Sequence, residues 1–162
     1  MKRFLIRAGI ALGLLAPLAA MVIPDFLRAQ NSGRQRRTMA DMRTIATAWE
    51  ARATDINSYT IGRPDKKSGA RMRPVATSDL ERALAPTYVR KFPRADGWGN
   101  AFQFSAGDFN ESGQAQFYTI RSLGGDQRLD RNPAVARGAT TDFASDVIYS
   151  NGSFTQYPEA SG

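Results

Sequence analysis

Hydrophobic positions divide the first third of the chain into two helical patterns. Residues 4–23 are apolar apart from Arg7, and they reach the roughly 20 residues that a helix needs to cross the hydrocarbon core of a bilayer. Beyond Pro24, apolar residues recur at steps of three and four, which is typical of one face of a long helix. These residues are Met39, Met42, Ile45, Ala46, Trp49 and Ala53. We therefore expect a membrane-type helix that continues into an amphipathic stem helix ending near Asn57.

The segment after the stem helix is polar and then briefly helical. Residues 60–76 are basic and rich in Gly and Pro, which predicts an exposed loop. Ser78 and Glu81 have the spacing of a capping box. They predict a short helix over LERALA (80–85) that Ser78 caps and Pro86 stops.

Short alternating segments in the last 60 residues predict strands. We expect four of them, at 101–105, 116–122, 147–150 and 153–157. Asn151-Gly152 between the last two is a strong hairpin signal. The expected apolar face consists of Phe102, Phe104, Tyr118, Ile120, Ile148 and Phe154, and alternation leaves Phe117 on the other face. The fold class predicted is α+β, with a long N-terminal helix packed on an antiparallel sheet of about four strands.

Two interpretations compete for the first segment. A secretory signal peptide has a basic start, a short apolar region and a small-x-small cleavage site, but Ala20 has Leu18 two residues before it. An uncleaved anchor is the other interpretation. Gly9 and Gly13 have the GxxxG spacing that lets two helices approach closely. Basic residues on both flanks are nearly equal in number, so they do not set the orientation.

Composition removes several functional classes. The chain of 162 residues has a net charge of +7 and contains neither Cys nor His. The sequence therefore offers no thiolate nucleophile, no Cys-based metal site and no imidazole base, and we expect no enzyme. The cluster of Arg34, Arg36 and Arg37 suits a solvated helix face or anionic lipid headgroups better than nucleic acid.

The stem segment resembles a known family. VIPDFLRAQNSGRQRRTMADMRTIATAWEARATDINSY (22–59) is similar to the stem helix of type IV pilin-like proteins, most of all the major pseudopilin of type II secretion systems. The phrase that contains Pro24 and Phe26 carries the match. RKFPRADGWGNAFQF (90–104), FYTIRSLGGDQRLD (117–130) and TDFASDVIY (141–149) resemble the later segments of that family in the same order.

The resemblance implies an architecture and a location. Residues 1–24 would be a single-pass anchor in the inner membrane of a Gram-negative-type bacterium. Residues 25–162 would be a periplasmic domain made of a stem helix (25–57) and an α/β head (58–162). The implied function is structural, by self-association or by assembly with other pseudopilin or secretion-system subunits through the N-terminal helix. The alternative is a tethered or exported pilin-fold binding module that does not polymerise.

The N-terminus departs from the family pattern. The family has a Gly at the prepilin cleavage point, then a Phe, and a Glu within the membrane segment. Counting back from Pro24 places Lys2, Arg3 and Arg7 at these positions. Because that Glu is thought to pair with a neighbouring subunit's N-terminal amine, Arg7 reverses the sign of the contact.

Acidic residues gather in two of the predicted loops. Asp126 and Asp130 lie in SLGGDQRLD, and Asp142 and Asp146 lie in TTDFASD. Calcium takes six to eight oxygen ligands from flexible loops, including backbone carbonyls such as that of Leu123. Related pseudopilins hold calcium in this region. We therefore expect a calcium site here if the two loops meet, although nearby arginines could neutralise the acids instead.

Overall fold

The chain folds as an α+β protein with a long N-terminal helix and one sheet. A computed structural model describes residues 2–62, 71–130, 138–140 and 142–158, and for residues 2–22, 138–140 and 158 it describes the backbone alone. The elements in chain order are α1 (Lys2–Ile56), β1 (Met72–Val75), α2 (Thr77–Leu84), β2 (Gln103–Phe109), β3 (Ala115–Ser122), β4 (Gly138–Thr140), β5 (Val147–Ser150) and β6 (Ser153–Pro158).

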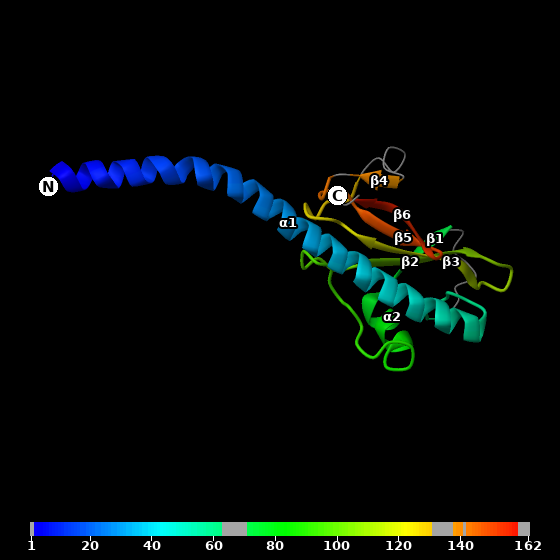
Figure 1. The fold of residues 1–162 in the computed structure, drawn as a ribbon. Helices are drawn as coiled ribbons and strands as arrows, with labels where there is room; N and C mark the ends of the chain where they lie inside the picture. Colours follow the sequence, from blue (N-terminus) through cyan, green and yellow to red (C-terminus); the bar gives the residue numbers. More distant parts are fainter. Residues whose placement is uncertain (1, 63–70, 131–137, 141, 159–162) are drawn as a thin grey trace.

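The sheet has the strand order β1-β2-β3-β5-β6-β4 (Figure 1). Five strands form antiparallel pairs, and β4 pairs with β6 in parallel. The prediction of about four strands is therefore two short. β1 was predicted as loop because it contains Pro74, which cannot donate to a ladder and is tolerated at an edge. β4 has three residues, too few for a recognisable alternation.

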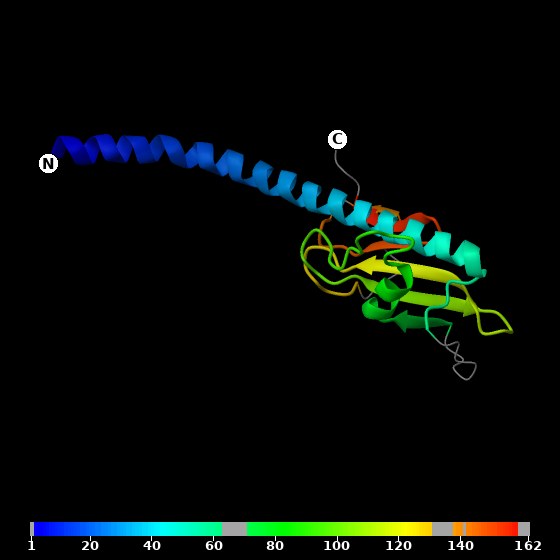
Figure 2. The ribbon, with the colours of Figure 1, turned by 90° about the horizontal axis from the view of Figure 1, so that it is seen from below.

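α1 crosses one face of this sheet, as Figures 1 and 2 show, and its apolar stripe belongs to the core between them. Met42, Ile45 and Trp49 are fully buried, as the helical periodicity predicts. The Trp49 ring lies 5.1 Å from the Tyr118 ring, centroid to centroid. Its Nε1 donates to the Tyr59 carbonyl at 3.1 Å, so the apolar side chain also satisfies its polar atom.

The N-terminal part of α1 extends away from the head (Figures 1 and 2). Helical backbone continues through Pro24, even though a proline removes one helical hydrogen bond. Large apolar side chains are exposed just beyond it: Ile23 is 55% exposed, Phe26 64% and Leu27 50%. At its other end α1 stops at Ile56, and Asn57 follows with φ 53°.

The sheet faces are as predicted except on β5. Phe102, Phe104, Tyr118 and Ile120 are buried in the core, and Phe154 packs against it. Ile148 was predicted on this face, which is wrong, since Val147 and Tyr149 are the buried residues. Antiparallel pairing sets this register because Tyr149 lies opposite Ile120 and shares its face.

The start of α2 also differs from the prediction. The helix begins at Thr77 and its N-cap is Ala76, with no side-chain cap, so the capping box from Ser78 to Glu81 does not form. The Glu81 carboxylate instead accepts two bonds from the Arg94 guanidinium, at 2.9 and 3.0 Å. This bidentate pair uses the oxygens that a capping box would need.

A tight loop contact fixes the head to α1 near its point of departure. The Gly97 amide donates to Thr38 Oγ1 at 2.8 Å, and that hydroxyl donates to the Arg34 carbonyl at 2.9 Å. A Cβ at Gly97 would lie 2.1 Å from the Arg34 carbonyl oxygen. The contact therefore needs glycine, because only glycine lets the two backbones come so close.

Gly97→Ala is expected to lower the free energy of unfolding by about 2 kcal/mol or more, because the added methyl collides with helix backbone that cannot yield cheaply. Gly33→Ala, one residue before Arg34, is the matched control. A Cβ there meets nothing within 4 Å, and alanine in a helix should raise stability by up to about 1 kcal/mol. Denaturant titration of the full-length chain measures both. Equal effects of the two substitutions would contradict the close-contact account.

Candidate functional site

Three loops meet at one end of the sheet, and Asp96 ties the first two together. This carboxylate is 4% exposed. Its Oδ1 accepts from the amides of Trp98 and Asn100 at 2.9 and 2.8 Å. Its Oδ2 accepts from the Ser122 hydroxyl at 2.6 Å. A buried carboxylate is stable when it is bonded in this way, so Asp96 anchors the turn after α2 to the end of β3.

The loop after β3 then meets the loop before β5. The Gly125 amide donates to the Phe143 carbonyl at 2.8 Å. Gly124 has φ +64°, and a Cβ there would lie 2.5 Å from the Ser145 carbonyl oxygen. The Asn100 side-chain amide donates to the Gly124 carbonyl at 2.9 Å. The two acidic loops are thus in direct contact.

Asp130 and Asp146 form the centre of this junction. The Asp146 amide donates to Asp130 Oδ2 at 3.0 Å, and the Asp130 amide lies 3.4 Å from Asp146 Oδ2. Gln156 on β6 donates its side-chain amide to Asp130 Oδ2 at 2.9 Å. Arg121 Nε on β3 lies 3.6 Å from Asp146 Oδ2. The exchange of bonds between backbone and side chains holds the two carboxylates beside each other.

Asp146 is the electrostatically unusual member. Its side chain is 1% exposed, and burial, reinforced by the nearby charges of Asp130 and Asp126, raises its pKa to about 6 against the opposing effect of Arg121. Oδ1 of Asp146 is buried and has no hydrogen-bond partner among the described residues. A buried acceptor in this state is costly, so a proton or a cation at this oxygen would stabilise the junction.

The remaining predicted calcium ligands lie around this pair. Asp126 is exposed and its Oδ1 accepts from the Arg128 amide at 2.9 Å. Asp142 is exposed, and its Oδ1 accepts from the Ala144 amide at 2.9 Å. Leu123 is half-buried at the start of its loop. Within the described part of the chain, no group of three or more acidic side chains is placed to hold a metal ion.

Sequence reasoning did not find three residues of this junction: Asp96, Arg121 and Gln156. No pattern near Arg121 points to its role. Its partner Asp146 lies in the loop before β5 and comes close only because β5 pairs with β3. Asp96 lies in DGWGN, and an Asp that begins a Gly-rich turn is a sign of side-chain capping. Gln156 is buried on β6, whereas a polar residue in a short strand is ordinarily expected to face solvent.

The residues of α1 that were predicted to act in assembly or in the membrane are described to different extents. Arg7, Gly9 and Gly13 belong to the segment of which only helical backbone is described, so their side chains lie outside the described residues. Pro24 and Phe26 are exposed on α1. Over the residues that the structure describes, a search for helices long and apolar enough to cross a bilayer finds none.

A scan against protein-family models, a search of curated proteins and a search of solved structures each found no match to this chain.

The stability of the head is expected to depend on pH through Asp146. Its carboxyl has a pKa of about 6 in the fold against 3.8 ordinarily, so the folded state holds the proton more tightly. This contribution is complete below about pH 4 and is lost as the pH rises through 6. Relative to Asp146→Asn, the free energy of unfolding should fall by about 2–3 kcal/mol over this range.

Denaturant titration from pH 3.5 to 7.5 in EGTA-containing buffer measures this difference. Subtracting the Asp146→Asn curve removes the titration of the other acids, so the remaining slope belongs to Asp146 and its coupled neighbours. A difference curve that is flat, or that rises with pH, would contradict the assignment.

Proposed function

We propose that this chain is a membrane-anchored, pilin-like structural subunit. It resembles a pseudopilin of type II secretion or related type IV pilus-like assemblies. Its N-terminal segment lies in the inner membrane and its head lies in the periplasm. It acts through association of its long helix with other copies or with related subunits, and it is not an enzyme.

The observation that carries the proposal is the division of α1 into a packed part and a projecting part. The helix has 55 residues, or about 80 Å at 1.5 Å per residue. The buried positions of α1 among the described side chains begin at Gln35. The head therefore uses less than half of α1, and the rest supports a role in contacts outside the head.

The projecting part has the chemistry that such contacts need. Residues 4–23 are apolar apart from Arg7, and 20 helical residues match a hydrocarbon core of about 30 Å. Ile23, Phe26 and Leu27 are at least half exposed, which is unfavourable in water for a cluster of this size. A bilayer surface or the stems of neighbouring subunits would cover them.

Calcium is the second part of the proposal. Hard oxygen donors suit this cation, and Asp130 and Asp146 are held side by side with Asp126 near enough to raise the pKa of Asp146. Asp146 Oδ1 is buried without a hydrogen-bond partner among the described residues. We expect calcium to draw the carboxylate of Asp126 toward those of Asp130 and Asp146, because no three acidic side chains of the described residues already stand together as ligands. Asp142 and the Leu123 carbonyl would be further ligands, and the ion would lock the two loops together.

Self-association is tested by cross-linking, since the chain has no cysteine and every introduced thiol is unique. Phe26→Cys in vesicles of phosphatidylethanolamine and phosphatidylglycerol should give dimers and larger species with a short bis-maleimide, because exposed stems pack side by side. Glu111→Cys, on the exposed turn between β2 and β3, is the matched control and should stay monomeric. Arg7→Glu should not reduce the Phe26→Cys products.

Phe26→Cys products no more abundant than those of Glu111→Cys would reject self-association. That outcome favours the tethered binding module. Such a module would bind its partner through residues 62–73, within the basic loop predicted at 60–76, and most of these residues lie outside the described ones.

Calcium binding is tested by thermal unfolding of the full-length chain. Calcium at about a hundred times its Kd should stabilise the fold by about 3 kcal/mol and raise Tm by several degrees, whereas magnesium should not. Asp146→Asn should abolish the rise. Asp108→Asn, exposed at the far end of β2, should retain it. A Tm that does not move with calcium, or that moves equally when EGTA is present, would end this part of the proposal.

A further inference from the structure

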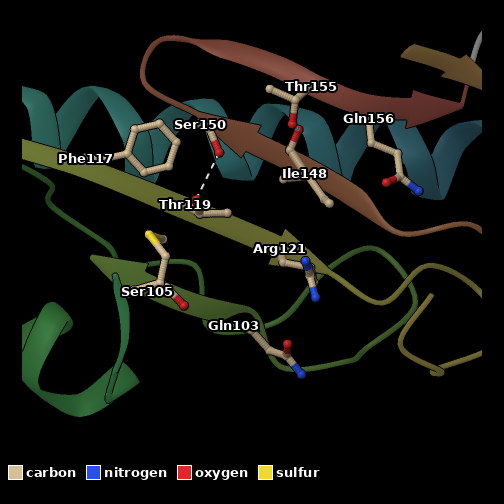
Figure 3. Close-up of a pocket in the computed structure, with 10 residues that line it drawn as sticks. Gln103, Ser105, Phe117, Thr119, Arg121, Ile148, Ser150, Thr155 and Gln156 are labelled. Atoms are coloured by element: carbon tan, nitrogen blue, oxygen red, sulfur yellow. Dashed lines mark hydrogen bonds between the residues drawn. The ribbon is translucent and has the colours of Figure 1, made fainter. Parts of the chain in front are cut away.

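The face of the sheet opposite α1 carries a hollow that the assembly role does not use. Its volume is about 520 Å³, within the range of ligand-binding pockets. Side chains of β1, β2, β3, β5 and β6 line it, as Figure 3 shows. We call it the outer groove.

Cross-strand register arranges the lining of the outer groove in three rows. The middle row is made of hydroxyls, since Ser105 lies opposite Thr119 and Thr119 lies opposite Ser150. Thr119 Oγ1 and Ser150 Oγ are 3.0 Å apart, the dashed line in Figure 3. These side chains are short, so they form the floor of the groove.

Longer side chains form the two ends. One end is apolar: Met72 and Phe117 both lie opposite Gly107. A Cβ on Gly107 would lie 2.2 Å from Met72 Sδ, so the glycine leaves the space that Met72 fills. Phe117 is half-buried, and its ring closes this end of the groove in Figure 3.

The other end is polar. Gln103 lies opposite Arg121, which lies opposite Ile148 and then Gln156. Arg121 is 30% exposed, and its one charged contact among the described residues is Asp146 at 3.6 Å. Phe117 and Arg121 are four positions apart on one strand, which sets the length of the groove at about 13 Å.

The lining of the outer groove has one charged side chain, and carboxylates lie next to it. Arg121 is its one charged lining residue, and its Nε lies 3.6 Å from Asp146 Oδ2. Asp130 and Asp126 lie close to Asp146, so an anionic ligand in the groove would meet their repulsion. Charge complementarity therefore disfavours an anionic ligand, and the uncharged donors and acceptors of the groove suit a neutral polar one.

We propose that the outer groove binds a short neutral oligosaccharide. A sugar ring has an apolar face of C–H groups, which suits the face of the Phe117 ring. Its hydroxyls both donate and accept, as do the hydroxyls of Thr119 and Ser150 and the amide of Gln103. The planar guanidinium of Arg121 can donate to two neighbouring sugar hydroxyls at once. This binding site is independent of self-association.

Calorimetric titration of the full-length chain tests the proposal, with chitotriose and cellotriose as neutral probes and trigalacturonate as the anionic probe of similar shape. The chain is held in zwitterionic detergent micelles, because glucoside and maltoside detergents would compete. At least one neutral trisaccharide should bind with Kd below about 1 mM, and trigalacturonate should bind more weakly than it.

Phe117→Ala should weaken this binding by about tenfold or more, and Thr119→Val, which removes a hydroxyl at nearly constant shape, by a few-fold. Phe109→Ala is the matched control. Phe109 is a half-buried phenylalanine on β2 that does not line the groove, so its removal should leave binding unchanged. Melting temperatures of the three variants separate a lost contact from a lost fold.

Four results would overturn the proposal. They are no binding of either neutral trisaccharide up to about 10 mM, tighter binding of trigalacturonate, equal weakening by Phe117→Ala and Phe109→Ala, and saturation of the groove by a neutral extended peptide but not by sugars.

Discussion

The indole of Trp49 holds the long helix on the sheet. It is fully buried, its ring contacts those of Tyr118 and Phe104, and its one polar atom is bonded to the Tyr59 carbonyl. The last bond ties the end of α1 to the segment that leads back to the sheet. Beside it, the Tyr118 hydroxyl donates to Glu50, and burial together with this carboxylate raises the pKa of Tyr118. The stem and the sheet thus share one aromatic core.

Two buried acids at the end of the sheet, Asp96 and Asp146, differ in how fully their carboxylate oxygens are hydrogen-bonded. Asp96 has hydrogen bonds on both oxygens, all to its own loop or to Ser122, so it acts as a fixed part of the fold. Asp146 has one oxygen bonded and one without a partner among the described residues. A carboxylate with hydrogen bonds on both oxygens stabilises a single arrangement of its loops. A partly bonded carboxylate lets the loops respond to a proton or a cation that binds the other oxygen.

Sequence predicted the local features of this chain and missed the non-local ones. The stripe from Met42 to Trp49 follows from periodicity within one helix, and the outward position of Phe117 follows from alternation within one strand. Ile148 was assigned to the wrong face because its register comes from pairing with β3, 27 residues earlier at Arg121. The same reason explains why the salt bridge of Arg121 was missed. The acidic loops were singled out through the family resemblance, while the bonds between them depend on backbone positions that no spacing encodes.

The exposed stretch of α1 between the head and the apolar segment sets the distance between the head and a lipid surface. Residues 24–34 are mostly exposed, and 11 helical residues measure about 17 Å. With the apolar segment in a bilayer, the head would stand about two Debye lengths from the lipid surface at physiological salt. Its charges would then be screened from the headgroups, so lipid composition would have little influence on the head's orientation. A single helix transmits rotation along its axis, and the head would turn with the stem.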